Sequence, residues 1–94
     1  MNNETLFAGE KAILRCRITG RPKPRYTWYK NDVQITAGDR RYKGFKLSEY
    51  EWGSKLTIKA VETTDTGYYT CEADNRVGRM SSTGILFARL GEQN

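Results

Sequence analysis

The chain has 94 residues and a mass of 10.8 kDa, with 37% hydrophobic and 29% charged residues. A chain of this length can form one domain, which we expect to span residues 1–94 with its core within about residues 6–90. No apolar run approaches the ~20 residues of a membrane-spanning helix, so we expect no direct insertion into a membrane. The sequence contains no histidine, which excludes Ser–His–Asp and Cys–His catalysis and His-ligated zinc. We therefore expect no enzyme activity and no metal or cofactor.

The net charge is +5, from 16 basic and 11 acidic residues. This balance favours polyanionic partners such as a sulfated glycan, although many soluble domains carry the same charge on a solvated surface without such a partner. Aromatic and basic residues also interleave in Tyr42-Lys43-Gly44-Phe45-Lys46. A half-buried edge strand explains that pattern, and we expect no nucleic-acid binding.

Apolar residues recur at every second position along the chain, which predicts strands rather than helices. In chain order the predicted strands are 12–18, 26–30, 33–35, 42–47, 54–59, 68–73 and 82–90. Between them lie the turn signals Gly20–Pro24, Asn31-Asp32, Gly38-Asp39 and Asp74–Arg79. Short strands at this spacing are typical of an antiparallel β-sandwich, so the predicted fold class is all-β.

Cys16 and Cys71 are the only cysteines. They admit three interpretations: two buried thiols, one reactive thiolate, or a disulfide. No nearby base or helix N-terminus is evident that would lower a thiol pKa, and a bridge closing so long a loop would stabilise the domain by about 4 kcal/mol. The sequence favours the disulfide and, with it, an oxidising compartment.

Other residues fit the same layout. Alternation places both cysteines on inward faces of different strands, and Trp28 follows Cys16 at a distance that lets it pack against the bridge. Tyr69 precedes Cys71 by two positions, where its hydroxyl can bond back to the turn Asp65–Gly67, with Gly67 expected at a positive φ. Leu56 is expected to point into the core from its own strand.

These residues resemble the immunoglobulin superfamily and, within it, the I-set. The resemblance is carried by Cys16, Gly20-x-Pro22-x-Pro24, Trp28, Leu56-x-Ile58, Asp65-x-Gly67-x-Tyr69-x-Cys71 and Ala73-x-Asn75-x-x-Gly78. It implies an immunoglobulin-like I-set sandwich with one inter-sheet disulfide. It also implies an ion pair between Asp65 and either Arg40 or Arg41.

A finer resemblance is to the extracellular immunoglobulin domain of Ror-family receptor tyrosine kinases. It is carried by Lys30-Asn31-Asp32, Asp39-Arg40-Arg41, Gly53–Leu56, Thr63–Tyr69 and Ser82–Phe87. It implies a non-catalytic binding or spacer module in the ectodomain of a single-pass receptor of Wnt signalling, with neighbouring receptor domains or a co-receptor as partners. The alternative is an I-set domain of an intracellular muscle or cytoskeletal filament protein, or of another cell-adhesion protein.

Three surface features are candidate sites. If Gly84, Leu86 and Ala88 point inward, Ile85 and Phe87 face outward beside Tyr29 as a protein interface; a register shifted by one residue would bury Phe87 instead. The loops at one end of the sandwich would gather a polyanion site from Arg21, Lys23, Arg25, Arg76 and Arg79. Asn3-Glu4-Thr5 is a sequon for N-glycosylation at Asn3.

Overall fold

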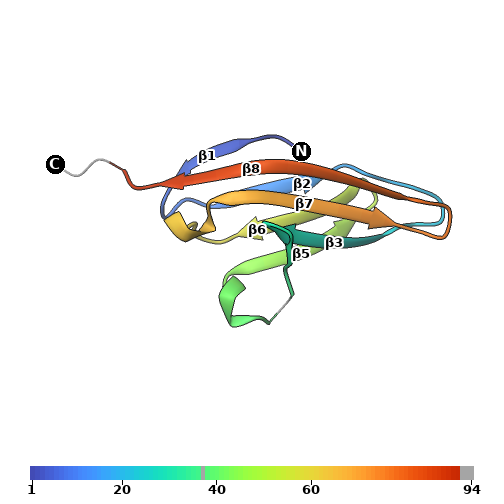
Figure 1. The fold of residues 1–94 in the computed structure, drawn as a ribbon, viewed down its shortest axis with the longest axis horizontal. Coiled ribbons are helices and arrows are strands. Elements are labelled where there is room, and N and C mark those ends of the chain that lie inside the picture. Colours follow the sequence, from blue (N-terminus) through green and yellow to red (C-terminus); the bar gives the residue numbers. More distant parts are fainter. Residues whose placement is uncertain (37, 92–94) are drawn as a thin grey trace.

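The chain folds into two β-sheets packed face to face (Figure 1). The structure is a computed structural model that describes residues 1–36 and 38–91; the end of the predicted domain, residues 92–94, lies outside the described part. The five-stranded sheet contains, in spatial order, β1 (Glu4–Phe7), β8 (Arg79–Arg89), β7 (Gly67–Asp74), β3 (Arg25–Lys30) and β4 (Val33–Gln34). The three-stranded sheet contains β2 (Ala12–Cys16), β6 (Gly53–Ile58) and β5 (Phe45–Tyr50).

All strand pairs are antiparallel except β1 and β8, which pair in parallel with Glu4 opposite Leu86. The predicted all-β sandwich is therefore confirmed. Strand β1 was not predicted, because four residues are too short for an alternation pattern to stand out. Its Leu6 is partly buried and packs against the core.

Two further differences lie between β4 and β6. The strand expected over 42–47 is β5 and begins at Phe45, and the residues before it form a one-turn 3-10 helix, η1 (Arg40–Tyr42). The side chain of Asp39 starts this turn by accepting a hydrogen bond of 2.9 Å from the backbone N–H of Arg41. A second such turn, η2 (Thr63–Asp65), precedes β7.

The core lies between the sheets and is built mainly from inward-facing residues of β2, β3, β6, β7 and β8. Its members include Leu14, Trp28, Leu56, Ile58, Tyr69 and Leu86, each at most 2% exposed. Cys16 of β2 and Cys71 of β7 form a disulfide with their Cα atoms 6.1 Å apart, so the bridge links the two sheets as expected. Gly53 lets β6 approach β2 closely, since a Cβ at this position would collide with the carbonyl oxygen of Cys16.

Candidate protein-binding surfaces

Trp28 holds the two sheets together at the centre of the core. It lies opposite Cys71 in the pairing of β3 with β7, and its indole Nε1 donates a hydrogen bond of 2.9 Å to Oγ of Ser54 on β6. The Ser54 hydroxyl donates in turn to the carbonyl oxygen of Ser48, at 3.0 Å. Sequence reasoning missed Ser54, although a polar residue two positions before the inward Leu56 was a usable signal.

Tyr69 makes the expected bond to the turn before its strand. Its hydroxyl donates a hydrogen bond of 2.5 Å to the carbonyl oxygen of Asp65. Burial of the phenol raises the pKa of Tyr69 well above its usual value, and the nearby Asp65 carboxylate adds to the shift. The hydroxyl therefore remains a neutral donor at all physiological pH values.

The expected ion pair of Asp65 with Arg40 or Arg41 was wrong. Arg41 pairs with Asp39, at 2.8 Å between Nη2 and Oδ2, because η1 places the two side chains next to each other. This contact holds the pKa of Asp39 below its ordinary value, chiefly through the hydrogen bond from the Arg41 side chain. The Asp65 carboxylate instead accepts a hydrogen bond of 2.8 Å from the backbone N–H of Glu62 and closes the first turn of η2.

The reason for glycine at position 67 also differs from the expectation. Its φ is not in the positive region; the space beside it is occupied by the Asn31 side chain, and a Cβ on Gly67 would lie 2.7 Å from Asn31 Oδ1. That oxygen accepts a hydrogen bond of 3.0 Å from the backbone N–H of Tyr68. Gly67 therefore makes room for a side chain that connects the β3–β4 turn to β7.

The outward face of the five-stranded sheet carries a row of half-exposed apolar side chains. Leu86 and Ala88 are buried while Ile85 and Phe87 are 51% and 50% exposed, so β8 has the expected register. Tyr68, 42% exposed, lies opposite Ile85 on β7, and Phe7 of β1, 51% exposed, continues the row beyond Phe87. We call Phe7, Tyr68, Ile85 and Phe87 the apolar face.

Tyr29 does not lie beside Ile85 as expected. Strand β7 separates β3 from β8, and Tyr29 is opposite Thr70, which is opposite Thr83. Tyr68 occupies the position next to Ile85, and its hydroxyl donates a hydrogen bond of 3.0 Å to Oδ2 of Asp32. Sequence reasoning missed Phe7 as a member of this face because it missed β1.

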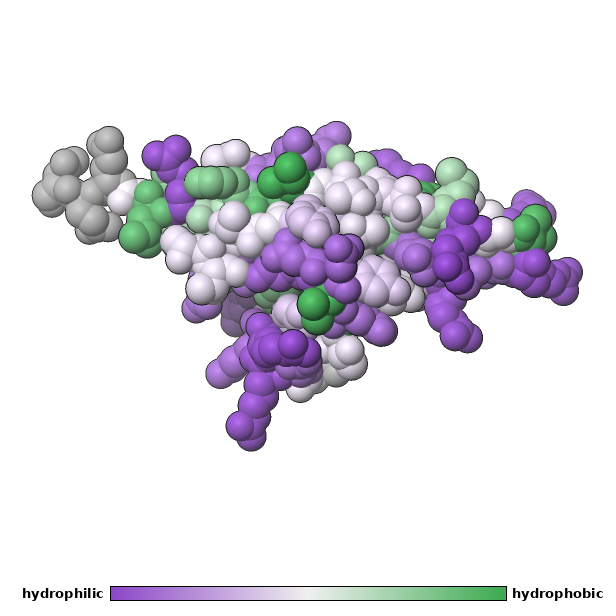
Figure 2. All heavy atoms as spheres, viewed as in Figure 1, coloured by the Kyte–Doolittle hydropathy of each residue, from purple (hydrophilic) through white to green (hydrophobic). Residues whose placement is uncertain are grey.

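The predicted polyanion cluster is divided between two sides of the loop end. The β2–β3 and β7–β8 loops do meet, since Asn75 Nδ2 donates to the carbonyl oxygen of Pro22 at 2.8 Å and the Arg21–Pro22 peptide is cis. An open hollow of about 750 Å³ there is lined by Pro22, Lys23, Pro24, Arg25, Glu49, Asp74, Asn75 and Arg76. Hydrophilic residues gather at this end of the molecule (Figure 2).

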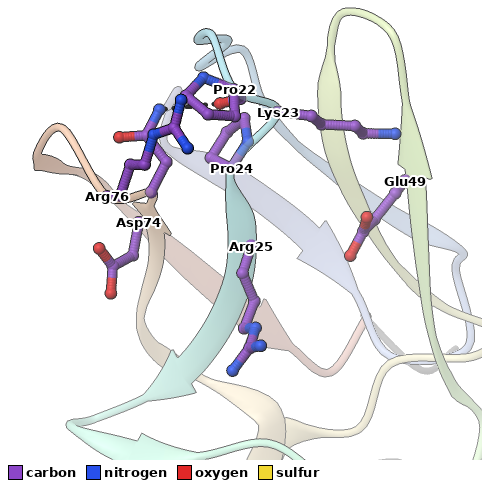
Figure 3. Close-up of a pocket in the computed structure, with 8 residues that line it drawn as sticks. Pro22, Lys23, Pro24, Arg25, Glu49, Asp74 and Arg76 are labelled. Atoms are coloured by element: carbon purple, nitrogen blue, oxygen red, sulfur yellow. Dashed lines mark hydrogen bonds between the residues drawn. The ribbon is translucent and has the colours of Figure 1, made fainter.

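The cations of this hollow do not converge on one point. Figure 3 shows the Lys23 and Arg25 side chains pointing in different directions, with Glu49 extending toward the space between their ends. Arg79 lies near two acids, 3.7 Å from Glu72 and 3.8 Å from Asp74, and Arg21 borders a separate hollow. Glycan binding at the loop end stays a prediction that this mixed charge does not favour.

Asn3 lies just before β1. Its Oδ1 accepts a hydrogen bond of 3.0 Å from the backbone N–H of Ile85, at the edge of the apolar face. Its glycosylation stays a prediction.

Over residues 1–36 and 38–91, no group of three or more Cys, Asp or Glu side chains is placed to hold a metal ion. Neither of the short helices described there has the length and apolar character that crossing a bilayer requires.

Comparison with known proteins identifies the family. The profile described as "Immunoglobulin domain" matches residues 1–75, and the chain belongs to this family. It is 37% identical over 87 residues to hemicentin-2 of Mus musculus, covering 93% of this chain and 2% of that protein. It is 34% identical over 85 residues to the striated muscle preferentially expressed protein kinase of Danio rerio, covering 90% of this chain and 3% of the kinase. Titin of Drosophila melanogaster is 36% identical over 81 residues, which is 85% of this chain.

Solved structures give the same fold. Titin domain M7 superposes with a TM-score of 0.84 at 32% identity, covering 95% of this chain and 87% of that one. The titin domains z1z2 in complex with telethonin give a TM-score of 0.87 at 27% identity, covering 97% of this chain and 44% of that one. These relatives show an immunoglobulin domain and do not support the finer resemblance to Ror receptors. The chain spans 3% or less of the length of the curated relatives named above.

Proposed function

We propose that this domain is a non-catalytic protein-binding and spacer module of a much larger intracellular muscle or cytoskeletal protein. The proposal takes up the alternative that the sequence left open. It is supported by the likeness to titin and to the kinase named for striated muscle, and by the small share of those proteins that one such domain covers.

The observation that carries the binding role is the apolar face. Its four side chains come from three adjacent strands, β1, β8 and β7, and each is between 42% and 51% exposed. Apolar side chains gathered on a flat sheet face, rather than scattered singly, mark protein–protein contact sites. A protein partner with a complementary apolar surface would remove them from water at a gain of about 25 cal/mol per Å².

The test uses the full-length parent protein carrying Ile85→Thr and Phe87→Thr, with Val77→Thr and Met80→Thr as the matched control. The control pair is also exposed and apolar, at 77% and 64%, but Val77 lies in the β7–β8 turn and Met80 at the start of β8, away from the apolar face. After cross-linking in cells and purification, we expect the partner cross-linked to this domain to be lost with the first pair and kept with the second. Equal recovery with both pairs would contradict the role of the apolar face.

A second candidate is a module of a receptor ectodomain, of the Ror type or another, and the disulfide favours it. Structural disulfides persist in oxidising compartments and are rare in the cytosol. Alkylating the protein in its native cells before lysis, and counting labelled cysteines by mass spectrometry, separates the two candidates. Two labelled thiols at Cys16 and Cys71 support the intracellular module, and none supports the ectodomain.

A further inference from the structure

The outward face of the three-stranded sheet carries basic side chains and no acidic ones. The pairing of β6 with β2 on one side and β5 on the other sets the outward positions of the three strands next to each other. The neutral side chains there are Ile13, Ser48, Tyr50 and Thr57. Five exposed or half-exposed cations share the face, two of them directly after a strand, and we call these five the cationic face: Arg15, Arg17, Lys46, Lys55 and Lys59.

The cationic face accounts for the whole net charge of the chain. Taking its five residues from the 16 basic ones leaves eleven, which equals the number of acidic residues, so the charge of +5 resides on this surface. Two carboxylates lie at its margin: Glu4, which lines a hollow of about 300 Å³ with Arg15 and Arg17, and Glu51 in the β5–β6 turn. In the part of the chain that the structure describes, neither forms an ion pair with a cation of this face.

The folded sheet places like charges directly opposite each other. Arg15 of β2 is the cross-strand partner of Lys55 on β6, and such a pairing destabilises a sheet. The positive charge also acts on Tyr50, whose pKa is lowered mainly by interaction with Lys55 and Ser48, with a further contribution from the charge of Lys46. Anions placed over the face would relieve this repulsion, so the surface is suited to an anionic ligand.

Two aromatic rings at one end of the face are already engaged by the protein itself. The rings of Tyr50 and Trp52 stack in parallel with centroids 5.0 Å apart. The Arg17 guanidinium lies over the Trp52 ring at 5.1 Å, and the Lys55 ammonium lies over the Tyr50 ring at 5.2 Å. These contacts position two cations without neutralising them. They also leave the rings no role as a stacking platform for bases, which disfavours a single-stranded nucleic acid as the ligand.

The cations form a two-dimensional array rather than a line. Neighbouring strands lie ~4.8 Å apart, and side chains on one face of a strand repeat every ~6.8 Å. Arg15 and Lys55 therefore form a row across the strands, Arg15 and Arg17 form a row along the chain, and Lys46 on β5 belongs to neither row. A linear polyanion, such as an acidic peptide or a sulfated glycan, follows one row at a time. A plane of anionic groups reaches all five cations together.

The residue types on this face distinguish a lipid surface from a protein surface as that plane. Protein–protein interfaces have an apolar centre and favour aromatic residues, methionine and arginine over lysine. Three of the five cations here are lysines, and the one aliphatic side chain among them, Ile13, is half-buried. The surface of an anionic bilayer needs no apolar contact and no fixed arrangement of charges, because its lipids move laterally, and it attracts clusters of about four to eight basic residues.

We propose that the cationic face adsorbs to a membrane surface rich in anionic lipid, with the three-stranded sheet lying against the headgroups and no residue entering the hydrocarbon. This inference goes beyond the proposed function and does not rest on it. The apolar face belongs to the other sheet, so it stays free for a protein partner while the cationic face lies on the membrane. The domain then connects a protein to a lipid surface.

The test measures co-sedimentation of the protein with phosphatidylcholine vesicles that contain about 30% phosphatidylserine, at an ionic strength of about 0.1 M. We expect binding at least about tenfold tighter than to vesicles of phosphatidylcholine alone. Lys46→Glu with Lys59→Glu replaces two exposed cations of the face and should weaken binding at least about tenfold. Lys23→Glu with Arg76→Glu makes the same change in net charge at the loop end and should alter binding less than about twofold.

Trp52 reports which surface touches the membrane. It is half-exposed at the end of the cationic face, whereas Trp28, the only other tryptophan, is 1% exposed. Quenching of fluorescence by acrylamide therefore comes from Trp52. We expect vesicles with phosphatidylserine to reduce this quenching about twofold, because the headgroups cover the ring. Unchanged quenching in vesicle-bound protein would show that another surface makes the contact and would overturn the proposal.

Equal binding to neutral and anionic vesicles, or equal losses in the two charge-reversed pairs, would also overturn it. So would displacement of the bound protein by a heparin hexasaccharide, polyglutamate or duplex DNA at a charge concentration equal to that of the anionic lipid, since a linear polyanion is then the better ligand. If Lys46→Glu with Lys59→Glu fails to fold, glutamine replaces glutamate in both pairs, and the cationic-face pair alone must then lose at least about threefold in binding.

The apolar-face variant separates this inference from the proposed function. Ile85→Thr with Phe87→Thr is expected to keep vesicle binding within about twofold while it loses the protein partner, because the two surfaces lie on different sheets. Loss of vesicle binding in this variant would contradict adsorption through the cationic face. Retention of the partner would contradict the role of the apolar face and leave the membrane result intact.

Discussion

The indole N–H of Trp28 and the hydroxyl of Ser54 form a 2.9 Å hydrogen bond that joins β3 of one sheet to β6 of the other. Both residues are about 1% exposed, so no water competes for either group. The disulfide and this bond therefore cross the core side by side, one covalent and one polar. Among the residues that the structure describes, every buried side-chain nitrogen or oxygen has a hydrogen-bond partner. Ser54 contributes by accepting the bond from Trp28 and donating one to Ser48.

Replacing Ser54 with alanine should destabilise the domain by about 1–3 kcal/mol, because the Trp28 N–H is then buried without an acceptor. Ser81→Ala is the control, since Ser81 is exposed on β8 and should change stability by less than about 0.5 kcal/mol. Chemical denaturation followed by tryptophan fluorescence measures both. Equal midpoints for the two variants would show that the hydrogen bond contributes nothing.

The raised pKa of Tyr69 predicts a specific loss of stability in alkali. Above the ordinary tyrosine pKa of 10.0 the unfolded chain releases this proton, whereas the folded chain keeps it because the phenol is buried. The unfolded state then binds fewer protons, so stability falls as pH rises, by at most about 1.4 kcal/mol per pH unit from this group.

Tyr69→Phe isolates that effect. The variant loses the hydrogen bond to Asp65 and should be less stable than the parent by about 1 kcal/mol at pH 8. The gap should shrink above pH 10, close near pH 11 and reverse by about pH 11.5, because only the parent has this proton to lose. Urea denaturation at each pH gives the comparison, and an unchanged gap at pH 11 would contradict the assignment.

Gly67→Ala should destabilise the domain by about 1–3 kcal/mol through overpacking against the Asn31 side chain. Adding Asn31→Gly removes the obstructing side chain and suits the positive φ of that turn residue, 48°. We expect the double variant to recover stability relative to Gly67→Ala alone, with a coupling of about 1 kcal/mol in a double-mutant cycle. Additive effects of the two substitutions would mean that the close approach does not matter.

The residues that specify the sandwich were readable from the sequence because their spacing reflects the fold directly. Alternation placed Cys16, Tyr69 and Cys71 on inward faces, and the disulfide that the sequence favoured is present. The spacing of Trp28 and Tyr69 from the cysteines predicted the burial of the indole and the bond from the Tyr69 hydroxyl. The partner of Asp65 did not follow. That partner depends on the path of the chain through η1. There Asp39 lies two residues from Arg41 and forms the ion pair with it, so Arg41 does not pair with Asp65.

Neighbours across strands were harder to predict for a related reason. The apolar face includes Phe7, which joins it only because β1 pairs in parallel with a strand some 80 residues away. Likewise, Arg15 lies opposite Lys55 only because of the register in which β2 pairs with β6. Alternation gives the side of a strand on which a residue lies, but not its neighbours across strands.

Reduction of the disulfide gives the last prediction. The bridge joins residues 55 positions apart, and in the chain-entropy model a loop of this length contributes about 4 kcal/mol by restricting the unfolded chain. The free energy of unfolding measured with and without dithiothreitol should differ by about that amount. The double variant Cys16→Ala with Cys71→Ala should have the stability of the reduced protein to within about 1 kcal/mol, apart from a further small loss due to the cavity that the substitutions leave. If the protein keeps its full stability when reduced, packing around Trp28 alone holds the sheets together, and the domain could serve equally well in a compartment where the bridge never forms.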